Sequence, residues 1–198
     1  LAPFIEQTIA FGDCSLVAID LKADTLELLA TMIRGAENLQ QQRGIDLPLK
    51  YLSTRDDFST FAFNPQTQPF WKRFGSYKRT DLLTGATGLD YGPDYGPAFY
   101  SAANAGVLNH TYKVYPSVET FENLAERCGH VLISADKREL HTEIRRNGVH
   151  VHEVLKRLGS FPPLNVTPEA GYPQDVIDNA IDLADVFRRP QMLYCHLS

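Results

Sequence analysis

The sequence predicts an α+β fold with a mainly antiparallel sheet, an N-terminal strand-helix-strand unit and a C-terminal helix that packs on the sheet. One observation is Asn147-Gly148, which lies between two alternating runs, residues 140–146 and 149–155. Both residues tolerate the positive φ of a type I′ turn, so this pattern is the strongest local signal for a β-hairpin. The other is an opening of alternating strand, amphipathic helix and return strand, which predicts the N-terminal unit.

The elements of the N-terminal half follow from hydrophobic periodicity. Residues 4–10 predict a short helix, and residues 16–22 alternate apolar and small or polar side chains as a strand does. A helix capped by Asp24 or Thr25 runs to about residue 42 and ends before Gly44. Further along, strands are predicted at 47–52 and 58–63 and a short aromatic helix at 70–78. Residues 84–106 are rich in Gly, Pro and Tyr and predict a long loop, a lid or a binding loop.

The C-terminal half predicts the main antiparallel sheet. Strands are expected at 111–115 and 130–134, on either side of a helix whose apolar residues between 118 and 128 share one face. The hairpin follows directly. Residues 175–188 predict an amphipathic helix that stops before Pro190, and residues 192–197 predict a last strand. The length suits one domain, residues 1–198.

Composition limits the classes of partner. The 198 residues are 43% hydrophobic and 22% charged, with net charge −5 and an isoelectric point of about 5.7. A chain with this charge has no global basic field, so nucleic acid is not favoured as a partner. No apolar run approaches the roughly 18–20 residues that cross a bilayer, and the first residues lack the pattern of a signal peptide. The chain is therefore expected to be soluble and not membrane-bound.

The predicted hairpin would bring chemically useful side chains together. Counting outward from the turn, His141, Glu143, Arg145, His150 and His152 share one face of the two strands. His150 and His152 predict a zinc or iron site, which His141 or Glu143 completes. Alternatively, one histidine is a general base oriented by Glu143, and Arg145 holds an anionic group of the substrate. A solvated outer face with paired charges fits the same pattern.

A second constellation comprises Asp13, Asp20 and Lys22. The order of one aspartate, six residues and then Asp-x-Lys at the end of an apolar strand resembles the core of PD-(D/E)xK nucleases. The resemblance implies that both carboxylates hold Mg²⁺ and that the lysine positions the attacking water. It covers about ten residues, and Gly12 rather than proline precedes the first aspartate.

A third candidate is a cysteine nucleophile. Cys14 comes early in the chain and His130 far downstream, an order that resembles cysteine peptidases and amidases and implies a thiolate-imidazolium pair. The three cysteines, at positions 14, 128 and 195, form no metal-binding or disulfide spacing. Buried free thiols account for them equally well.

Aromatic and basic residues alternate between positions 71 and 79, and this pattern is typical of ligand-stacking surfaces. Trp71 together with Tyr91 and Tyr95 of the expected loop is therefore a candidate substrate-binding set. The combined prediction is an enzyme that hydrolyses a small or anionic substrate by acid-base or metal-assisted chemistry. The alternatives are a non-enzymatic binding or assembly domain with a protein partner, which uses this aromatic-basic surface, and a magnesium-dependent nuclease.

Overall fold

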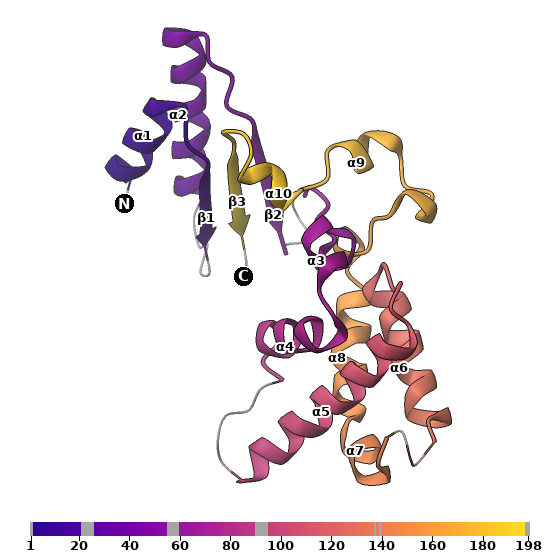
Figure 1. Cartoon of the computed structure of the whole chain (residues 1–198). Helices are drawn as coiled ribbons and strands as arrows, with labels where there is room; N and C mark the ends of the chain where they lie inside the picture. The colour runs from indigo at the N-terminus through magenta and orange to yellow at the C-terminus, as the bar shows by residue number, and fades with distance from the viewer. Residues whose placement is uncertain are drawn as a thin grey trace. The chain divides into compact units, whose positions relative to one another are not determined.

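The computed structural model of the chain describes residues 2–20, 26–54, 60–89, 95–136, 138 and 140–196. The chain divides into two compact units, which are drawn in Figure 1. Unit 1 comprises Leu1–Phe63 and Pro173–Ser198, and unit 2 comprises Asn64–Tyr172. The expectation that these form one domain stays a prediction. The fold is α+β and mostly helical.

Unit 1 is built around a three-stranded sheet. Its elements are α1 (Ala2–Phe11), β1 (Leu16–Asp20), α2 (Glu27–Arg43), β2 (Leu49–Ser53), α9 (Gln174–Asp178), α10 (Leu183–Val186) and β3 (Met192–His196). The strand order is β1-β3-β2, so the last strand of the chain lies between the first two. Both pairings are parallel, as the three arrows in Figure 1 show. The prediction of a mainly antiparallel sheet is therefore wrong.

Successive side chains of a strand point to opposite faces of the sheet, so alternate residues of β3 face the same helices. Met192 and Tyr194 of β3 are fully buried and point to the face covered by α1 and α2. Ile9 of α1 and Met32 of α2 meet them there. The helices approach closely because Gly35 faces Ile9, whose Cδ1 would lie only 3.0 Å from a Cβ at that position.

Unit 2 is entirely helical in the residues that the structure describes. Its elements are η1 (Pro65–Thr67), α3 (Pro69–Arg73), α4 (Ser76–Ala86), α5 (Tyr95–Val114), α6 (Phe121–Ser134), α7 (Thr142–Asn147), α8 (Val149–Gly159), η2 (Pro162–Leu164) and η3 (Pro168–Ala170). Helix α5 packs against α4, α6, α7 and α8. The core of the unit joins these helices through fully buried apolar side chains, among them Val107, Leu124 and Val151.

The predicted hairpin at residues 140–155 is wrong, because these residues form α7 and α8. Gly148 has a φ of −84°, which excludes a type I′ turn. The apolar residues at 151, 154, 155 and 158 are spaced as one face of a helix, and Val151 and Leu155 are buried in the core. Gly148 has a packing role instead: a Cβ there would lie well inside contact distance of Val107 Cγ2.

Several other predicted elements are wrong, because their residues form helices or, at residues 60–63, no regular element. Residues 111–115 and 130–134 continue the helices α5 and α6 rather than forming strands. The expected long loop at 84–106 is mostly helical, since α4 runs to Ala86 and α5 begins at Tyr95; residues 90–94 lie outside the part that the structure describes. The C-terminal helix expected at 175–188 is two short helices, α9 and α10. Residues 60–63 form no strand, and 58–59 are not described.

Candidate functional site

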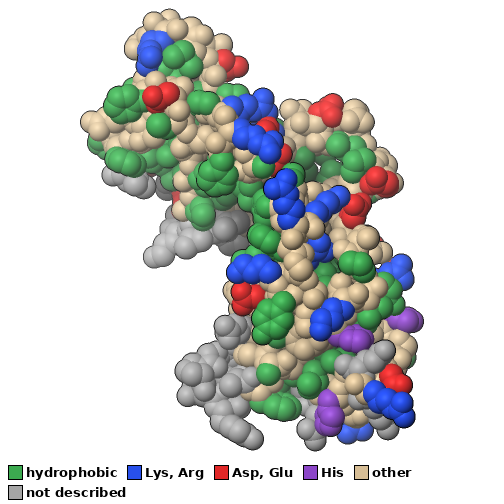
Figure 2. All heavy atoms as spheres, viewed as in Figure 1, with side chains coloured by type: hydrophobic (Ala, Val, Ile, Leu, Met, Phe, Trp, Pro, Cys, Tyr) green, Lys and Arg blue, Asp and Glu red, His purple; other side chains and the backbone are tan. Residues whose placement is uncertain are grey.

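The histidines expected to share a site are separated by the helical structure. His150 and His152 lie two residues apart on α8, which places them about 200° apart around the helix axis. His150 is exposed, whereas His152 packs against Gly129 of α6, and its Nδ1 lies 3.7 Å from Glu153 Oε1. On the face drawn in Figure 2, histidine side chains lie at separate points rather than in one cluster. Two ligands from this pair for one ion are incompatible with α8.

The other members of the expected cluster do not restore it. His141 lies just before α7, and the side chain of Glu143 is outside the described part of the structure. Arg145 donates from Nη1 to the backbone oxygen of Ala135, at 2.9 Å, and so ties α7 to the end of α6. Among the residues that the structure describes, no group of three His, Cys, Asp or Glu side chains is placed to hold a metal ion.

The nuclease-like residues are also separated. Asp13 precedes the amino end of β1 and Asp20 is its last residue. The strand alone spans about 13 Å between Leu16 and Asp20, so the two carboxylates cannot ligate one Mg²⁺. Lys22 lies outside the described residues.

Cys14 is a poor candidate for a nucleophile. Its exposed thiol donates a hydrogen bond to Asp13 Oδ1 at 3.3 Å, and this bond and the charge of Asp13 raise the pKa of the thiol. A raised pKa disfavours the thiolate, which is the reactive form. His130 belongs to unit 2, where its Nδ1 lies 2.9 Å from Tyr115 Oη and 3.1 Å from Ser134 Oγ.

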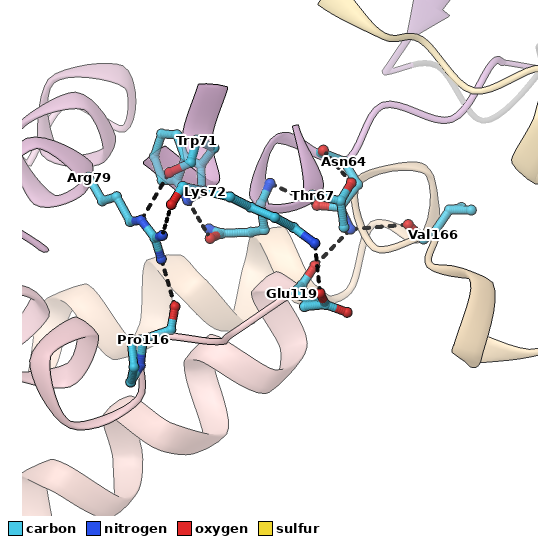
Figure 3. Close-up of polar contacts among 9 residues, drawn as sticks. Asn64, Thr67, Trp71, Lys72, Arg79, Pro116, Glu119 and Val166 are labelled. Atoms are coloured by element: carbon cyan, nitrogen blue, oxygen red, sulfur yellow. Dashed lines mark hydrogen bonds and ion pairs between the residues drawn. The ribbon is translucent and has the colours of Figure 1, made fainter. Parts of the chain in front are cut away.

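Trp71 and Arg79 of the aromatic-basic segment are buried in unit 2, whereas Lys72, Tyr77 and Lys78 are exposed. Figure 3 shows the polar contacts of this segment. Trp71 is 6% exposed, and its Nε1 donates to Gln66 Oε1 at 2.9 Å. The amide of Gln66 donates in turn to Tyr112 Oη at 3.1 Å. Of the predicted partners of Trp71, Tyr91 is outside the described residues, and Tyr95 begins α5 with a side chain that is not described. Trp71 is therefore a core residue.

Arg79 holds this segment together. Its guanidinium donates to the backbone oxygens of Trp71 (3.1 Å), Phe74 (2.9 Å), Lys72 (3.2 Å) and Pro116 (2.8 Å). Figure 3 shows the side chain between the backbone at residues 71–74 and that at Pro116. Carbonyls at the C-terminus of a helix lack intrahelical partners. A cation there also interacts favourably with the negative end of the helix dipole. Arg79 thus caps the C-terminus of α3.

The parallel sheet of unit 1 brings together three polar residues that the sequence did not identify as a set. Asp20, His196 and Ser53 are the last residues of β1, β3 and β2, and the strand register places Asp20 and Ser53 directly beside His196. Neighbouring strands are about 4.8 Å apart, and register partners point to the same face of a sheet. A carboxylate, an imidazole and a hydroxyl therefore stand in a row at the carboxyl edge.

This row lies at the end of the unit's core rather than on its open surface. Ser53 is 1% and His196 is 2% exposed, while Asp20 is half-buried. Tyr194 Oη donates to Asp20 Oδ2 at 3.2 Å, and the ring of Tyr194 lies 6.3 Å from that of His196. Burial, with this hydrogen bond and the charge of Asp20, raises the pKa of Tyr194 to about 12. Tyr194 is therefore a fixed donor that orients the carboxylate of Asp20 at neutral pH.

Backbone contacts fix the strand ends. Thr54 N donates to His196 O at 3.1 Å, which continues the pairing of β2 and β3 beyond the strands. Ser53 N donates to Thr60 Oγ1 at 2.9 Å, so the segment after β2 folds back to this edge. Rigid strand ends hold side chains more precisely than loops do.

Helix α2 adds a positive end to the same edge. A helix that follows a parallel strand runs back along the sheet, so its N-terminus lies at the carboxyl edge. The N-cap residue of α2 is Leu26, whose side chain accepts no hydrogen bond from the first turn. The helix dipole favours negative charge at this end, where Glu27 of the first turn already supplies one, and the first backbone N–H groups can donate to a carboxylate or phosphate.

No protein family model, curated protein or solved structure matches this chain. None of the helices in the described ranges combines the length and apolar character needed to cross a membrane. At the carboxyl edge of the sheet in unit 1, an imidazole, a carboxylate and a hydroxyl lie beside the N-terminus of α2.

Proposed function

We propose that unit 1 is a hydrolytic enzyme for a small anionic substrate, with its site at the carboxyl edge of the parallel sheet. The observation that supports this is the register that puts Asp20 and Ser53 on either side of His196. In open sheets of parallel strands, ligands bind outside the carboxyl ends of the strands. The carboxyl edge is a different site from the expected histidine hairpin, because the helices α7 and α8 separate the histidines of that hairpin.

Each residue of the row has a chemical role that its position permits. His196 accepts the proton of the Ser53 hydroxyl, and Asp20 stabilises the imidazolium that forms. The hydroxyl oxygen of Ser53 then attacks the ester of the substrate, the bond to the alcohol breaks, and the imidazolium of His196 gives its proton to the departing alcohol. His196 next takes a proton from water, which attacks the ester formed on Ser53, and returns that proton to Ser53 as the acid leaves. Ser53 and His196 are almost wholly buried, so this edge must open to admit the substrate; once the substrate is bound, the charges that develop are screened weakly. Tyr194 holds Asp20 in place through its hydrogen bond to Oδ2.

The choice of an anionic substrate follows from α2. Its N-terminal N–H groups can bind a carboxylate or phosphate of the substrate while the ester faces Ser53. The binding group and the reacting bond would then be held by different elements of unit 1, which fixes the orientation of the substrate.

Hydrolysis of chromogenic esters tests the proposal. We would compare mono-p-nitrophenyl succinate and p-nitrophenyl phosphate, which are anionic, with the neutral p-nitrophenyl acetate. We expect an anionic ester to be preferred, and Asp20→Asn and His196→Gln to lower kcat/KM by about 10²–10⁴-fold. Asp13→Asn and His150→Gln are matched controls, because they change the same residue types at exposed positions, Asp13 before the amino end of β1 and His150 in unit 2. Equal loss in the control variants, or turnover that is insensitive to Asp20→Asn and His196→Gln, would refute the proposed site.

A further inference from the structure

A cavity of about 330 Å³ lies between α4 and α5 of unit 2. Its α4 wall includes Tyr77, Thr80 and Asp81, and its α5 wall includes Gly106 and Asn109. The wall on α5 is otherwise made of small side chains, so there is space between the two helices. A volume of about 300 Å³ lies at the lower end of the range for small-molecule sites.

Two buried polar atoms in this cavity have no hydrogen-bond partner. They are Thr80 Oγ1 and Asn109 Oδ1. Thr80 is 4% exposed, and it differs in this respect from another threonine of the same wall: Thr84 Oγ1 donates to Thr80 O at 3.0 Å. A helical threonine usually bonds to the preceding turn in the way Thr84 does. The Thr80 hydroxyl instead remains available to the cavity.

Unpartnered buried polar groups cost free energy, so native proteins usually satisfy them with protein, water or a ligand. A single water takes up about 30 Å³ of liquid, far less than this cavity holds. The two atoms line the same space, and a ligand that enters it can bond to both. The cavity thus combines unpaired polar atoms with room for a small molecule.

The hydrogen-bonding groups and the charge of the cavity walls indicate which class of ligand fits. The described residues that line the cavity include one carboxylate, Asp81, and no basic side chain. Asn109 Oδ1 and the carboxylate accept hydrogen bonds, and the Thr80 hydroxyl can do so. Tyr77 is 79% exposed and offers an aromatic ring, which attracts cations. Lys78 Nζ lies 3.3 Å from Asp81 Oδ2, but both side chains are more than half exposed, so this pair is weak.

We propose that the α4-α5 cavity binds a cationic group with several N–H donors, a guanidinium or a primary ammonium. Thr80, Asp81 and Asn109 accept its hydrogen bonds and Tyr77 covers it. The group can belong to a free small molecule or to an arginine or lysine side chain. This site belongs to unit 2, whereas the row at residues 20, 53 and 196 belongs to unit 1, and its test requires no catalytic activity.

Amide NMR on the full chain tests the proposal, with methylguanidinium chloride as the probe. Sodium chloride at equal ionic strength and sodium acetate serve as controls. We expect saturable shifts at the amides of Thr80, Gly106 and Asn109 with methylguanidinium alone. Thr80→Val and Asp81→Asn should each raise Kd about tenfold, as expected for a lost hydrogen bond to a charged group. Thr84→Val, which lines the same cavity but removes a satisfied hydroxyl, should change Kd less than about twofold.

A second titration, with N-acetyl-arginine methylamide, distinguishes the source. Binding tighter than that of methylguanidinium indicates a protein side chain, and weaker binding indicates a free small molecule. Ligand-free Thr80→Val gives an independent readout: its denaturation midpoint should rise, because an unpartnered hydroxyl has been removed. The proposal is overturned by shifts that do not saturate, by equal effects of Thr80→Val and Thr84→Val on Kd, or by a lower midpoint in Thr80→Val, which would show that ordered water already satisfies the hydroxyl.

Discussion

Replacement of Arg79 by methionine should destabilise unit 2 by about 3 kcal/mol. The guanidinium makes four hydrogen bonds to backbone oxygens, at 2.8–3.2 Å, and the residue is only 8% exposed. A hydrogen bond to a charged group is worth about 1.5–3 kcal/mol, but two of these four share the Nε donor. Burying methionine in place of a cation offsets part of the loss. Three lost donors at the lower value of about 1.5 kcal/mol each cost about 4.5 kcal/mol, and an offset of about 1.5 kcal/mol leaves about 3 kcal/mol.

The chain offers a specific probe for this measurement. Trp71 is the one tryptophan in the sequence, and it is buried in the core of unit 2. Its fluorescence in urea therefore reports unfolding of unit 2 rather than of unit 1. Arg73→Met is the matched control, because Arg73 is an exposed arginine on the same short helix. A loss below about 1 kcal/mol for Arg79→Met, or one equal to that of Arg73→Met, would refute the capping role.

Three further predictions concern stability. Asn104 is 1% exposed on α5, and both polar atoms of its amide lack partners; Asn104→Leu should therefore stabilise unit 2 by about 1–3 kcal/mol in the same urea assay, and destabilisation would contradict this. Gly148→Ala should lower the free energy of unfolding by about 1–3 kcal/mol, because the added Cβ meets Val107. Gly85→Ala lies in open space on α4 and should raise it by roughly 0.5–1 kcal/mol. Equal effects of the two substitutions would contradict the packing role of Gly148. Folding raises the pKa of Tyr194 to about 12, so its hydroxyl stays protonated to a higher pH in the folded state than in the unfolded state. Unit 1 should therefore lose stability as the pH rises from about 10 to 12. Circular dichroism of urea unfolding should show a smaller loss for Tyr194→Phe, by on the order of 1 kcal/mol between about pH 10 and 11.

Local periodicity predicted the elements of the sheet in unit 1 but not its topology. The expected strands at 16–22, 47–52 and 192–197 overlap β1, β2 and β3, and the helix between the first two is α2. The direction of pairing depends on which strands become neighbours, and β3 comes from the far end of the chain. No periodicity within a short window carries that information. The antiparallel sheet was inferred from the second half of the chain, which is helical in the described residues.

The hairpin prediction was wrong because the apolar residues of this segment fit both the two-residue period of a strand and the 3.6-residue period of a helix. Val149, Val151 and Leu155 fit an alternating strand, while Val151, Val154, Leu155 and Leu158 fit one face of a helix. Contacts with α5 and α6 favour the helical pattern, and α8 packs against both. Asn-Gly is compatible with a turn, but here the glycine is needed where Val107 of α5 approaches. Tertiary packing therefore decided between two locally acceptable structures.

The candidate site was within reach of the sequence once the strands were known to be parallel. Asp20, Ser53 and His196 each lie within two residues of the end of an expected strand, and the carboxyl ends of parallel strands meet at one edge. Asp20 alone was identified, through its resemblance to a nuclease carboxylate. The unpartnered atoms of the α4-α5 cavity depend on helix packing and have no signal in the sequence.

The most direct test of the proposed enzyme is hydrolysis of mono-p-nitrophenyl succinate by the protein and its Asp20→Asn, His196→Gln and Asp13→Asn variants, with circular dichroism to confirm that each is folded. The proposed row predicts turnover that falls by at least about 100-fold in the first two variants and is unchanged in Asp13→Asn. Failure of the folded protein to hydrolyse this ester or p-nitrophenyl phosphate, or full activity in Asp20→Asn and His196→Gln, would contradict it.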